Sequence, residues 1–471
     1  MDAHVWMGSR KVVSKSYMKR FSPYDGREVS RSAVCSVEDA KNALKIAQNA
    51  SKAARKVPLY QRCAWMLDVA SKLREYREEF AKTLCDEVGK PITYARIEVD
   101  RCIETITLSA ETMRTMHGET INADAMASGR SAHAYWRREP VGVVVAITPF
   151  NFPLNLVAHK LAPALVAGNT VVLKPTPEAP LCAYKLAKLF IESPYATLDA
   201  LSVVYGDAEV GNALVSSDIP RVISFTGSVG VGNSITRNAG IKKISLELGG
   251  NAATYIDTSA DLEYAASRCA IGAFVNSGQV CISLQRIYVE SSIYDAFAQK
   301  MAEATAKLVV GSPYNEETFL GPLINDEAAI RAMNWVESAI EEGARALTPP
   351  HREGRIFYPC VMADVSESMK IVCEEVFAPI VSLVRVDGID DAIERMNNSP
   401  YGLQFSIFTN NLAHAKKVID ECEAGGIVVN DMPTLRFDIQ PYGGVKLSGV
   451  GREGPRFAIE EFTEIKSIVI L

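Results

Sequence analysis

The chain has 471 residues, of which 48% are hydrophobic and 23% charged, so we expect two or three domains and an ordinary globular composition. The formal net charge of −6 argues against nucleic acid as the main partner, because binding to phosphates favours a surplus of basic residues. The start of the chain has no apolar run of signal-peptide length, and the longest apolar runs are about half a membrane span, so we expect a cytoplasmic protein without membrane attachment.

The ten cysteines are spread singly along the chain, at positions 35, 63, 85, 102, 182, 269, 281, 360, 373 and 422. None forms a CxxC pair and no Cys/His cluster has the spacing of a zinc site, so we expect no metal. In a reducing compartment most of them are small buried residues. Cys281 needs a separate explanation, because in "SGQVCIS" (277–283) it stands between a Gly-Gln pair and a short apolar stretch.

The first predicted elements are helices over residues 38–115. Apolar residues recur there at helical spacing, and the segment "QRCAWMLDVASKLREYREEFAKTLCDEVGKP" (61–91) ends in glycine and then proline. The next segment, "SAHAYWRREP" (131–140), alternates like a strand and stops at a proline.

Five apolar runs then alternate with helical segments, and this pattern predicts a parallel, doubly wound sheet with helices on both faces. The runs are "VGVVVAIT" (141–148), "NTVVLKP" (169–175), "ALSVVYG" (200–206), "RVISFTGS" (221–228) and "KKISLELGG" (242–250).

A second α/β alternation starts near residue 252. Its predicted strands are 252–257, 285–292, 404–409 and 426–430, and its predicted helices are 261–278, 293–308 and 412–425. The last segment, "FTEIKSIVIL" (462–471), has the pattern of a terminal strand, which we expect to pair with another strand or another chain.

Two strand ends carry candidate ligand-binding groups. The turn "FTGSVGVG" (225–232) leads from a strand into a helix, where backbone N–H groups and the helix dipole favour an anion; its ordinary alternative is a turn that only packs. Lys174 ends another strand, where it can hold a ribose hydroxyl or a phosphate, or can be a solvated lysine.

Three further residues indicate a reaction. Asn151 at a strand end can donate to an oxyanion, or can cap the following helix. Glu247 is costly to bury without a partner or a role, and it is placed to act as a general base. With the Cys281 thiol they predict an attack on an aldehyde, loss of a hydride to a nicotinamide, and hydrolysis of the resulting thioester.

From about residue 20 onward the chain resembles the aldehyde dehydrogenase superfamily. The resemblance rests on seven motifs in the family's order: "ITPFNFP" (147–153), "KPTPEAP" (174–180), "FTGS" (225–228), "LELGG" (246–250), "GQVC" (278–281), "EEVFAP" (374–379) and "PYGGVKLSGVGREG" (441–454).

The resemblance implies roles for the matching residues. Cys281 matches the nucleophile, Asn151 the oxyanion donor and Glu247 the base for deacylation. The implied cofactor is NAD or NADP, held by Ile147, Thr148, Pro149, Phe150, Lys174, Thr176, Pro177, Phe225, Gly227, Ser228, Gly232, Leu248, Gly249, Glu375 and Phe377.

The resemblance also implies an α/β fold with a Rossmann-like cofactor domain (1–122 and 139–248), an α/β catalytic domain (249–446) and a small β oligomerisation arm (123–138 and 457–471). The strand around 123–138 and the terminal strand match that arm. We therefore expect a homodimer or homotetramer that acts on a small-molecule aldehyde.

Two positions depart from the family's common pattern. Ala378 stands where glycine is usual, and Pro177 stands where NAD-preferring members carry the glutamate that repels a 2′-phosphate; here the glutamate is Glu178. The choice between NAD and NADP is therefore open. A CoA-acylating enzyme is one alternative, which the presence of Glu247 disfavours, and a non-enzymatic protein on the same fold is another.

The resemblance also implies a substrate tunnel, whose walls would include Phe152, Leu156, Val280 and Ile282 and whose mouth would be lined by the loop 430–444. Arg436 in this loop has two interpretations. It pairs with Asp431 or Asp438 and shapes the loop, or it grips the anionic or hydroxylated tail of a short aldehyde such as a semialdehyde, a lactaldehyde or a phosphorylated glyceraldehyde.

Overall fold

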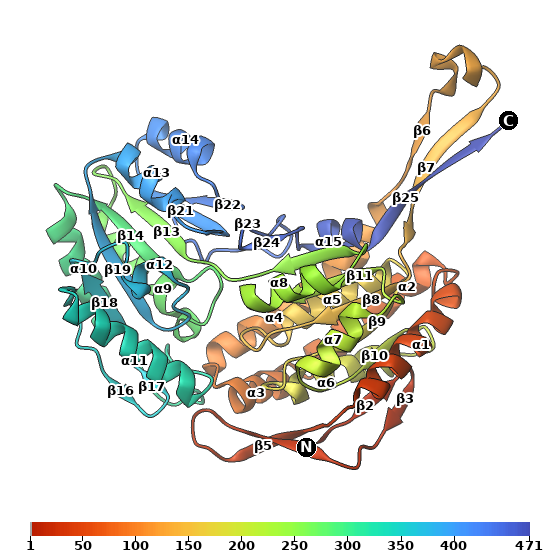
Figure 1. Ribbon diagram of the computed structural model, residues 1–471, viewed down its shortest axis with the longest axis horizontal. Coiled ribbons are helices and arrows are strands. Elements are labelled where there is room, and N and C mark those ends of the chain that lie inside the picture. The colour runs from red at the N-terminus through yellow and green to blue at the C-terminus, as the bar shows by residue number, and fades with distance from the viewer. Residues whose placement is uncertain (1) are drawn as a thin grey trace.

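The computed structural model describes residues 2–471, and its first body is built on an eight-stranded sheet in the order β24-β12-β11-β8-β9-β10-β2-β3 (Figure 1). The five central strands are β8 (Val143–Ile147), β9 (Thr170–Lys174), β10 (Leu201–Val203), β11 (Val222–Thr226) and β12 (Lys243–Glu247). Each lies parallel to its neighbours among these five, which confirms the predicted doubly wound sheet.

Helices surround this sheet; those over residues 59–115 pack on the helices at residues 155–191 and not directly on its strands. They are α1 (Val37–Ala54), α2 (Leu59–Glu75), α3 (Arg77–Val88), α4 (Ile92–Thr115), α5 (Asn155–Val166), α6 (Pro180–Ile191), α7 (Ala208–Ser216) and α8 (Val229–Asn238). Helix α1 starts with a capping box between Ser36 and Asp39, and α3 ends at Gly89 in the left-handed conformation (φ 67°). The predicted helical region 38–115 is confirmed.

The sequence pattern did not predict the N-terminal strands. Strands β2 (Val5–Met7) and β3 (Arg10–Val12) extend the first sheet at one edge, and β24 (Gly449–Val450) extends it at the other. Strands β1 (Asp2–Ala3), β4 (Tyr17–Phe21) and β5 (Glu28–Ala33) form a separate small sheet. These strands are short, and β3 and β4 are largely exposed, so the alternation that marks a half-buried strand is weak in them.

The second body contains a seven-stranded sheet in the order β15-β18-β19-β14-β13-β21-β22. Its strands are β13 (Ala252–Ile256), β14 (Leu284–Glu290), β15 (Arg345–Ala346), β18 (Cys360–Ala363), β19 (Ile380–Val386), β21 (Gln404–Phe408) and β22 (Gly426–Val429). All neighbours are parallel except the β15–β18 pair. The four strands predicted after residue 252 are β13, β14, β21 and β22.

The helices of this body are α9 (Leu262–Phe274), α10 (Tyr294–Ala306), α11 (Asp326–Glu341), α12 (Lys370–Cys373), α13 (Ile389–Asn397) and α14 (Leu412–Glu421). A 3-10 turn, η3 (Val275–Gly278), follows α9. A small hairpin, β16 (Arg352–Glu353) with β17 (Ile356–Phe357), and a two-stranded antiparallel pair, β20 (Tyr401–Gly402) with β23 (Val445–Lys446), complete it.

A three-stranded arm projects from the first body and carries the C-terminus (Figure 1). It consists of β6 (Glu119–Ile121), β7 (His133–Pro140) and β25 (Thr463–Ile470), and helix α15 (Pro455–Glu461) leads into it. Strand β25 pairs with β7 along its full length, from Thr463 opposite Pro140 to Ile470 opposite His133. The predicted terminal strand therefore pairs within the chain, and β25 is still an edge strand.

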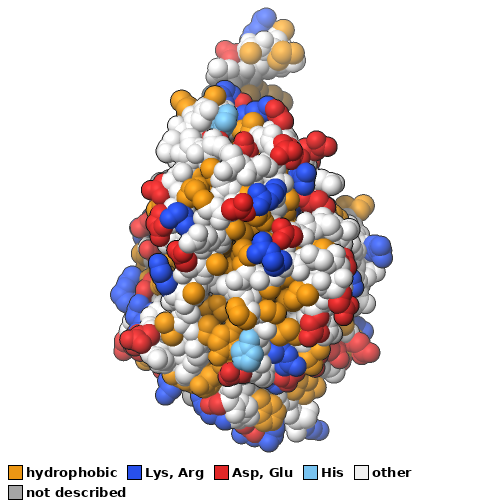
Figure 2. Space-filling view, turned by 90° about the vertical axis from the view of Figure 1, so that its left-hand side faces the viewer, with side chains coloured by type: hydrophobic (Ala, Val, Ile, Leu, Met, Phe, Trp, Pro, Cys, Tyr) orange, Lys and Arg blue, Asp and Glu red, His pale blue; other side chains and the backbone are white. Residues whose placement is uncertain are grey.

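Residues 123–129 of the arm form two short 3-10 turns, η1 (Ala123–Ala125) and η2 (Ala127–Gly129), so the strand starts at His133. On the face shown in Figure 2, acidic and basic side chains are interspersed and the arm stands above the main body. Within residues 2–471 no helix has both the length and the apolar character that a membrane crossing needs.

Candidate active site

A cavity of 540 Å³ brings together residues from both bodies. From the first body it is lined by predicted site residues Pro149, Phe150, Asn151, Phe152, Leu156, Gly227, Ser228, Glu247, Leu248 and Gly249, and from the second by Val280, Cys281, Ile282, Glu375, Phe377 and Arg436. The first set follows the carboxyl ends of β8, β11 and β12, where ligands bind to open α/β sheets. The remaining predicted residues, Ile147, Thr148, Lys174, Thr176, Pro177, Phe225 and Gly232, belong to the same edge of the first sheet but do not line this cavity.

The loop before Cys281 has an unusual backbone. Asn276 and Ser277 have positive φ angles of 52° and 55°, and Gly278 follows at 71°. A Cβ at Gly278 would collide with the carbonyl oxygen of Ala378. Side chains hold this conformation, since the Ser277 hydroxyl donates to the Gly321 carbonyl at 2.8 Å. Strained residues of this kind persist where the surroundings enforce them, often beside a reactive group.

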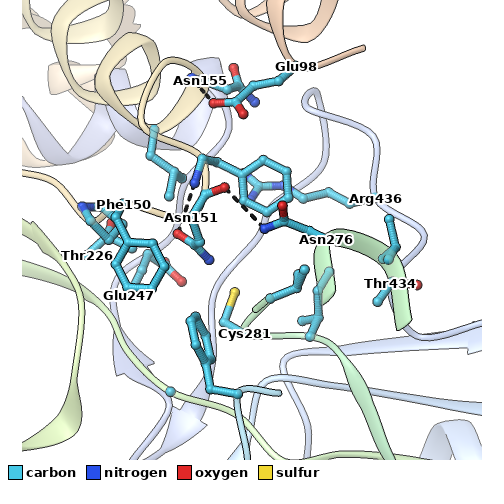
Figure 3. Close-up of a pocket in the computed structure, with 18 of the residues that line it drawn as sticks. Glu98, Phe150, Asn151, Asn155, Thr226, Glu247, Asn276, Cys281, Thr434 and Arg436 are labelled. Carbon is cyan, nitrogen blue, oxygen red and sulfur yellow. Dashed lines mark hydrogen bonds between the residues drawn. The ribbon is translucent and has the colours of Figure 1, made fainter. Parts of the chain in front are cut away.

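The Cys281 sulfur points into the cavity (Figure 3) and lies 3.0 Å from the Tyr442 hydroxyl. Burial raises the pKa of the Cys281 thiol to about 11, and the Tyr442 hydrogen bond and the Arg436 charge act against that rise. Most of the other cysteines are buried; Cys373 is exposed and Cys422 is half-buried. Cys281 is thus the cysteine that faces the shared cavity.

Asn151 faces Cys281 across the cavity (Figure 3). Its backbone carbonyl accepts hydrogen bonds from Lys90 Nζ at 2.7 Å and Asn276 Nδ2 at 3.4 Å. Its side-chain oxygen accepts from the Phe152 N–H at 3.1 Å, and among the described residues its NH₂ group has no acceptor. This leaves an amide donor for a ligand oxygen near the sulfur.

Asn151 does not cap helix α5. The N–H groups of Leu154 and Asn155 donate instead to one oxygen of Glu98, at 2.9 and 3.2 Å. The other oxygen of Glu98 pairs with Lys90, and both side chains are buried. The Lys90–Glu98 pair therefore fixes both the start of α5 and the backbone of Asn151.

Glu247, the last residue of β12, is 3% exposed and its two carboxyl oxygens have no hydrogen-bond partner in the described structure. Burial, followed by the nearby charge of Glu453, raises the pKa of Glu247 well above its usual range, against the opposing effect of Arg436, Lys160 and Arg452. A carboxyl without a fixed partner is free to hydrogen-bond a water molecule in the cavity.

Neither of the two aspartates expected from the sequence forms a hydrogen bond with Arg436. Asp431 pairs with Arg268 at 2.6 Å. Asp438 pairs with Arg101 at 2.8 Å and His159 at 3.0 Å, and its oxygen is 3.8 Å from Arg436 Nε. The Arg436 guanidinium instead stacks on Tyr442, 3.6 Å from the ring centre, and reaches Glu453 at 3.4 Å.

The Nε–H of Arg436 is buried without an acceptor. Because its contacts to Glu453 and Asp438 are long, this guanidinium has hydrogen-bonding capacity left. Its position on the cavity wall (Figure 3) makes that capacity available to a ligand.

The edge of the first sheet fits a dinucleotide. Ser228 caps helix α8 by accepting a hydrogen bond from the Val231 N–H at 3.4 Å. The free N–H groups at the N-terminus of this helix therefore lie beside Gly227. Lys174 is 8% exposed and has no hydrogen-bonded side-chain partner among residues 2–471; burial lowers its pKa. The buried hydroxyls of Thr148 and Thr226 also lack partners, so this edge carries several polar groups that a ligand can satisfy.

The other end of the dinucleotide site faces Cys281. The Glu375 carboxylate accepts from the Gly250 N–H at 3.0 Å, and burial raises the pKa of Glu375 to about 7. A Cβ at Gly249 would collide with that carboxylate. Phe377, at a positive φ of 50°, packs edge-on against Phe150 with ring centres 6.0 Å apart. These residues form a narrow slot suited to a planar ring and a ribose.

Near Lys174, Pro177 is exposed and Glu178 is half-buried. The Thr176 hydroxyl donates to the Glu178 carboxylate, and Glu178 is the acidic residue with the strongest effect on the pKa of Lys174. A carboxylate is therefore close to this lysine although residue 177 is proline.

The sequence reasoning missed several cavity residues. They are Lys90, Tyr94, Ile97, Glu98, Arg101, Asn155, Thr226, Val275, Asn276, Arg331, Met432, Thr434, Tyr442 and Glu453. Thr226 lies inside the "FTGS" motif, Tyr442 inside "PYGG" and Glu453 inside "REG", so three of them were within motifs already recognised. Most of the others lie on α4 or in loops, where no local pattern distinguishes a cavity residue from a core residue.

Comparisons with known proteins agree with this geometry. The sequence profile described as "Aldehyde dehydrogenase family" matches residues 9–468. A 3-sulfolactaldehyde dehydrogenase of Priestia aryabhattai is 44% identical over 454 residues, covering 96% of this chain and 94% of that protein.

Two solved structures have the same fold. Aldehyde dehydrogenase 21 from Physcomitrella patens, in complex with the reaction product succinate, has a TM-score of 0.97 and 35% identity and covers 100% of this chain and 98% of its own. A glyceraldehyde-3-phosphate dehydrogenase from Methanocaldococcus jannaschii, complexed with NADP, has a TM-score of 0.94 and 38% identity and covers 97% of this chain and 100% of its own.

Proposed function

The chain belongs to the aldehyde dehydrogenase family and is an NAD(P)-dependent aldehyde dehydrogenase, and we propose that Cys281, Asn151 and Glu247 carry its reaction on a short aldehyde with an anionic or hydroxylated tail. The observation that carries this proposal is the shared cavity, in which the Cys281 sulfur, the Asn151 amide and the Glu247 carboxyl face one another.

The reaction starts with the Cys281 thiolate, whose electron pair forms the bond to the aldehyde carbon while the carbonyl electron pair moves to oxygen. The Asn151 NH₂ group and the Cys281 backbone N–H donate to that oxyanion. NAD(P)⁺, when bound, supplies the hydride acceptor that converts the thiohemiacetal into a thioester.

Glu247 completes the cycle as the base for hydrolysis. The carboxylate takes a proton from a water molecule, the water oxygen attacks the thioester carbon, and the carboxylic acid leaves as the thiolate is restored. Glu247 suits this role because its oxygens have no competing protein donor. The presence of Glu247 as a base for hydrolysis also disfavours the CoA-acylating alternative. Turnover in buffer without CoA separates the two.

Two residues support an anionic or hydroxylated substrate. Arg436 presents donors with long protein contacts to the cavity, and Arg101 lies on the same wall, bound to Asp438. Relatives named for 3-sulfolactaldehyde and lactaldehyde, and solved neighbours complexed with succinate or named for glyceraldehyde 3-phosphate, share this small polar class of compounds.

The test is a panel of aldehydes run with NAD⁺ and with NADP⁺. We expect the highest kcat/KM for a sulfonated, carboxylated, phosphorylated or hydroxylated short aldehyde, and a much lower value for propanal. In Arg436→Ala the KM for the anionic aldehyde should rise about tenfold or more, through loss of a charge-assisted hydrogen bond, and the KM for propanal should change little.

Arg268→Ala is the matched control, because Arg268 holds the same loop through Asp431 but is not part of the cavity wall. If Arg436 only shapes the loop, the KM values for the anionic aldehyde and for propanal rise equally in both variants, and the substrate proposal is wrong. If the wild type oxidises no aldehyde in the panel with either cofactor, a non-enzymatic role gains support.

The domain assignment of 1–122 with 139–248, 249–446, and 123–138 with 457–471 remains a proposal, supported by the two separate sheets and the arm. We also propose a cytoplasmic homodimer or homotetramer without a nucleic-acid or membrane partner. The open edge of β25, with Ile465, Val469 and Ile470 exposed, supports assembly through the arm. Sedimentation of the purified chain tests this, and a monomer at micromolar concentration would contradict it.

A further inference from the structure

Tyr442 is a fully buried side chain whose hydroxyl contacts the reacting sulfur. The residue is 5% exposed, and its oxygen is 3.0 Å from Cys281 Sγ. Its position is set by its own element, because the N–H of Tyr442 donates to the Glu453 carbonyl at 3.1 Å and the N–H of Glu453 donates to the Tyr442 carbonyl at 2.6 Å. This isolated antiparallel bridge ties the tyrosine backbone to the segment before α15.

A second contact fixes the ring. The Arg436 guanidinium lies over it with Cζ 3.6 Å from the ring centre, and Glu453, held by Lys160 at 3.1 Å, is 3.4 Å from that guanidinium. A cation over an aromatic face withdraws electron density from the ring and so makes the phenol O–H a stronger donor. The backbone bridge to Glu453 and the stacked Arg436 guanidinium thus both fix the tyrosine with its hydroxyl against the sulfur.

The direction of the hydrogen bond follows from the chemistry of the two groups. A thiolate is only an acceptor, so a phenol beside it must donate. Burial raises the pKa of Tyr442 well above its usual range, so the phenol keeps its proton when the thiol has lost its own. Removal of the Tyr442 oxygen would leave the buried thiolate without its side-chain donor.

We propose that Tyr442 is a further catalytic residue, whose hydroxyl donates a hydrogen bond to Cys281 Sγ and stabilises the attacking thiolate. Tyr442 transfers no proton in this role: the thiol proton goes to solvent, and the phenol proton stays on its oxygen. The inference rests on the proposed role of Cys281 as nucleophile and names a residue that this role requires.

The charged groups around the sulfur are Arg436 from the same loop, Glu375 after α12 and Glu247 at the end of β12. The arginine favours the thiolate and the two glutamates oppose it. Arg436 also acts on the phenol, so the effect of Tyr442 must be measured with Arg436 in place. Tyr442→Phe meets this condition, because it retains the ring under the guanidinium and removes only the oxygen.

The test follows alkylation of Cys281 by iodoacetamide in the full-length protein without aldehyde, from about pH 6 to about pH 10.5. Mass spectrometry of the Cys281 peptide separates this reaction from that of the exposed Cys373. In Tyr442→Phe we expect the profile to move to higher pH by about one unit, which makes alkylation near neutral pH about tenfold slower. Because the pKa of Cys281 is about 11, neither protein reaches its plateau by about pH 10.5, so the alkylation rates are compared at each pH below it.

Tyr255→Phe is the matched control, because it removes another buried phenol oxygen, bonded to Glu290 at 3.3 Å, at a distance from the cavity, and we expect a wild-type profile. An unchanged profile in Tyr442→Phe would overturn the proposal, as would faster alkylation, which would show that the tyrosine restrains the thiol. An equal loss in Tyr255→Phe would show a structural effect only.

If Tyr442→Phe does not fold, 3-fluorotyrosine incorporated at position 442 decides the matter, since fluorine acidifies the phenol and strengthens its donation. Between about pH 6 and about pH 8 alkylation should then become faster; an unchanged rate would overturn the proposal. Because alkylation needs no aldehyde, this result is independent of aldehyde turnover: a wild type that turns over while both variants titrate normally refutes only the role of Tyr442.

Discussion

Replacement of Glu247 by glutamine perturbs a buried carboxyl that has a proposed function and a cost for stability. The side chain is 3% exposed and lacks a hydrogen-bond partner, and burial raises its pKa well above its usual range. In the unfolded chain the carboxyl ionises near its ordinary pKa of about 4.3, so above that pH the folded state holds one proton more than the unfolded state.

The sign of the stability effect follows from that difference. A group that binds more protons when folded lowers the free energy of unfolding as pH rises, by at most about 1.4 kcal/mol per pH unit for one proton. The loss begins above the unfolded pKa and ends once the folded carboxyl has ionised. A glutamine amide does not ionise, so the Glu247→Gln variant escapes this loss. We therefore expect the Tm of Glu247→Gln minus that of the wild type to increase as the pH rises above about 4.3, and to level off once the folded carboxyl has ionised.

Scanning calorimetry or fluorescence of both proteins over this range is the assay, with the Tm difference as the quantity of interest. Loss of the base should also slow steady-state turnover by about two to four orders of magnitude, while an initial burst of reduced cofactor survives. A Tm difference that stays constant or decreases with pH would refute the buried neutral carboxyl. Turnover equal to the wild type would refute the role of Glu247 as base.

Three other predictions concern the same cavity. Cys281→Ala should abolish aldehyde oxidation and retain cofactor binding measured by calorimetry, whereas Cys373→Ser should stay within a few-fold of wild type; turnover in Cys281→Ala would contradict the nucleophile. Asn151→Ala should lower kcat about a hundred- to a thousandfold, the cost of losing an oxyanion donor, and a variant with unchanged kcat would exclude that role. Because Pro177 cannot repel a 2′-phosphate, the kcat/KM ratio should favour NAD⁺ over NADP⁺ by less than about a thousandfold, roughly 4 kcal/mol; a larger ratio would assign the exclusion to another group, of which Glu178 beside Lys174 is the first to test.

Much of the fold was predictable because its strands are buried on both faces. The continuous apolar runs that became β8 to β12, and the helical spacing in α1 to α4, come from local burial that a single sequence displays. Strand β19 (Ile380–Val386) was not predicted, although its sequence "IVSLVRV" is an apolar run of the same kind that starts directly after Pro379. Among the N-terminal strands, β1, β2 and β3 are too short for such a signal, and β4 is too exposed.

The positions of Cys281, Asn151 and Glu247 on one cavity agree with the expectation from motifs at strand ends. Their immediate partners were not predictable, because they come from residues far apart in the chain: Lys90 with Asn151, and Tyr442 with Cys281. Arg436 illustrates the same limit. Proximity in sequence suggested Asp431 or Asp438. Asp438 forms a long ion pair with Arg436 at 3.8 Å, whereas Asp431 pairs with Arg268 on α9, and the Arg436 guanidinium also lies against Tyr442 and Glu453.

The most direct measurement of the proposed mechanism is the mass of the covalent intermediate in Glu247→Gln. The variant is mixed with NAD(P)⁺ and an aldehyde that the wild type oxidises, quenched in acid, and analysed as intact protein and as peptides. We expect an acyl group of the mass of the product acid less one water, located on Cys281, and no such adduct in Cys281→Ala. An acyl group on another residue, or continued turnover by Glu247→Gln with unmodified Cys281, would contradict the mechanism.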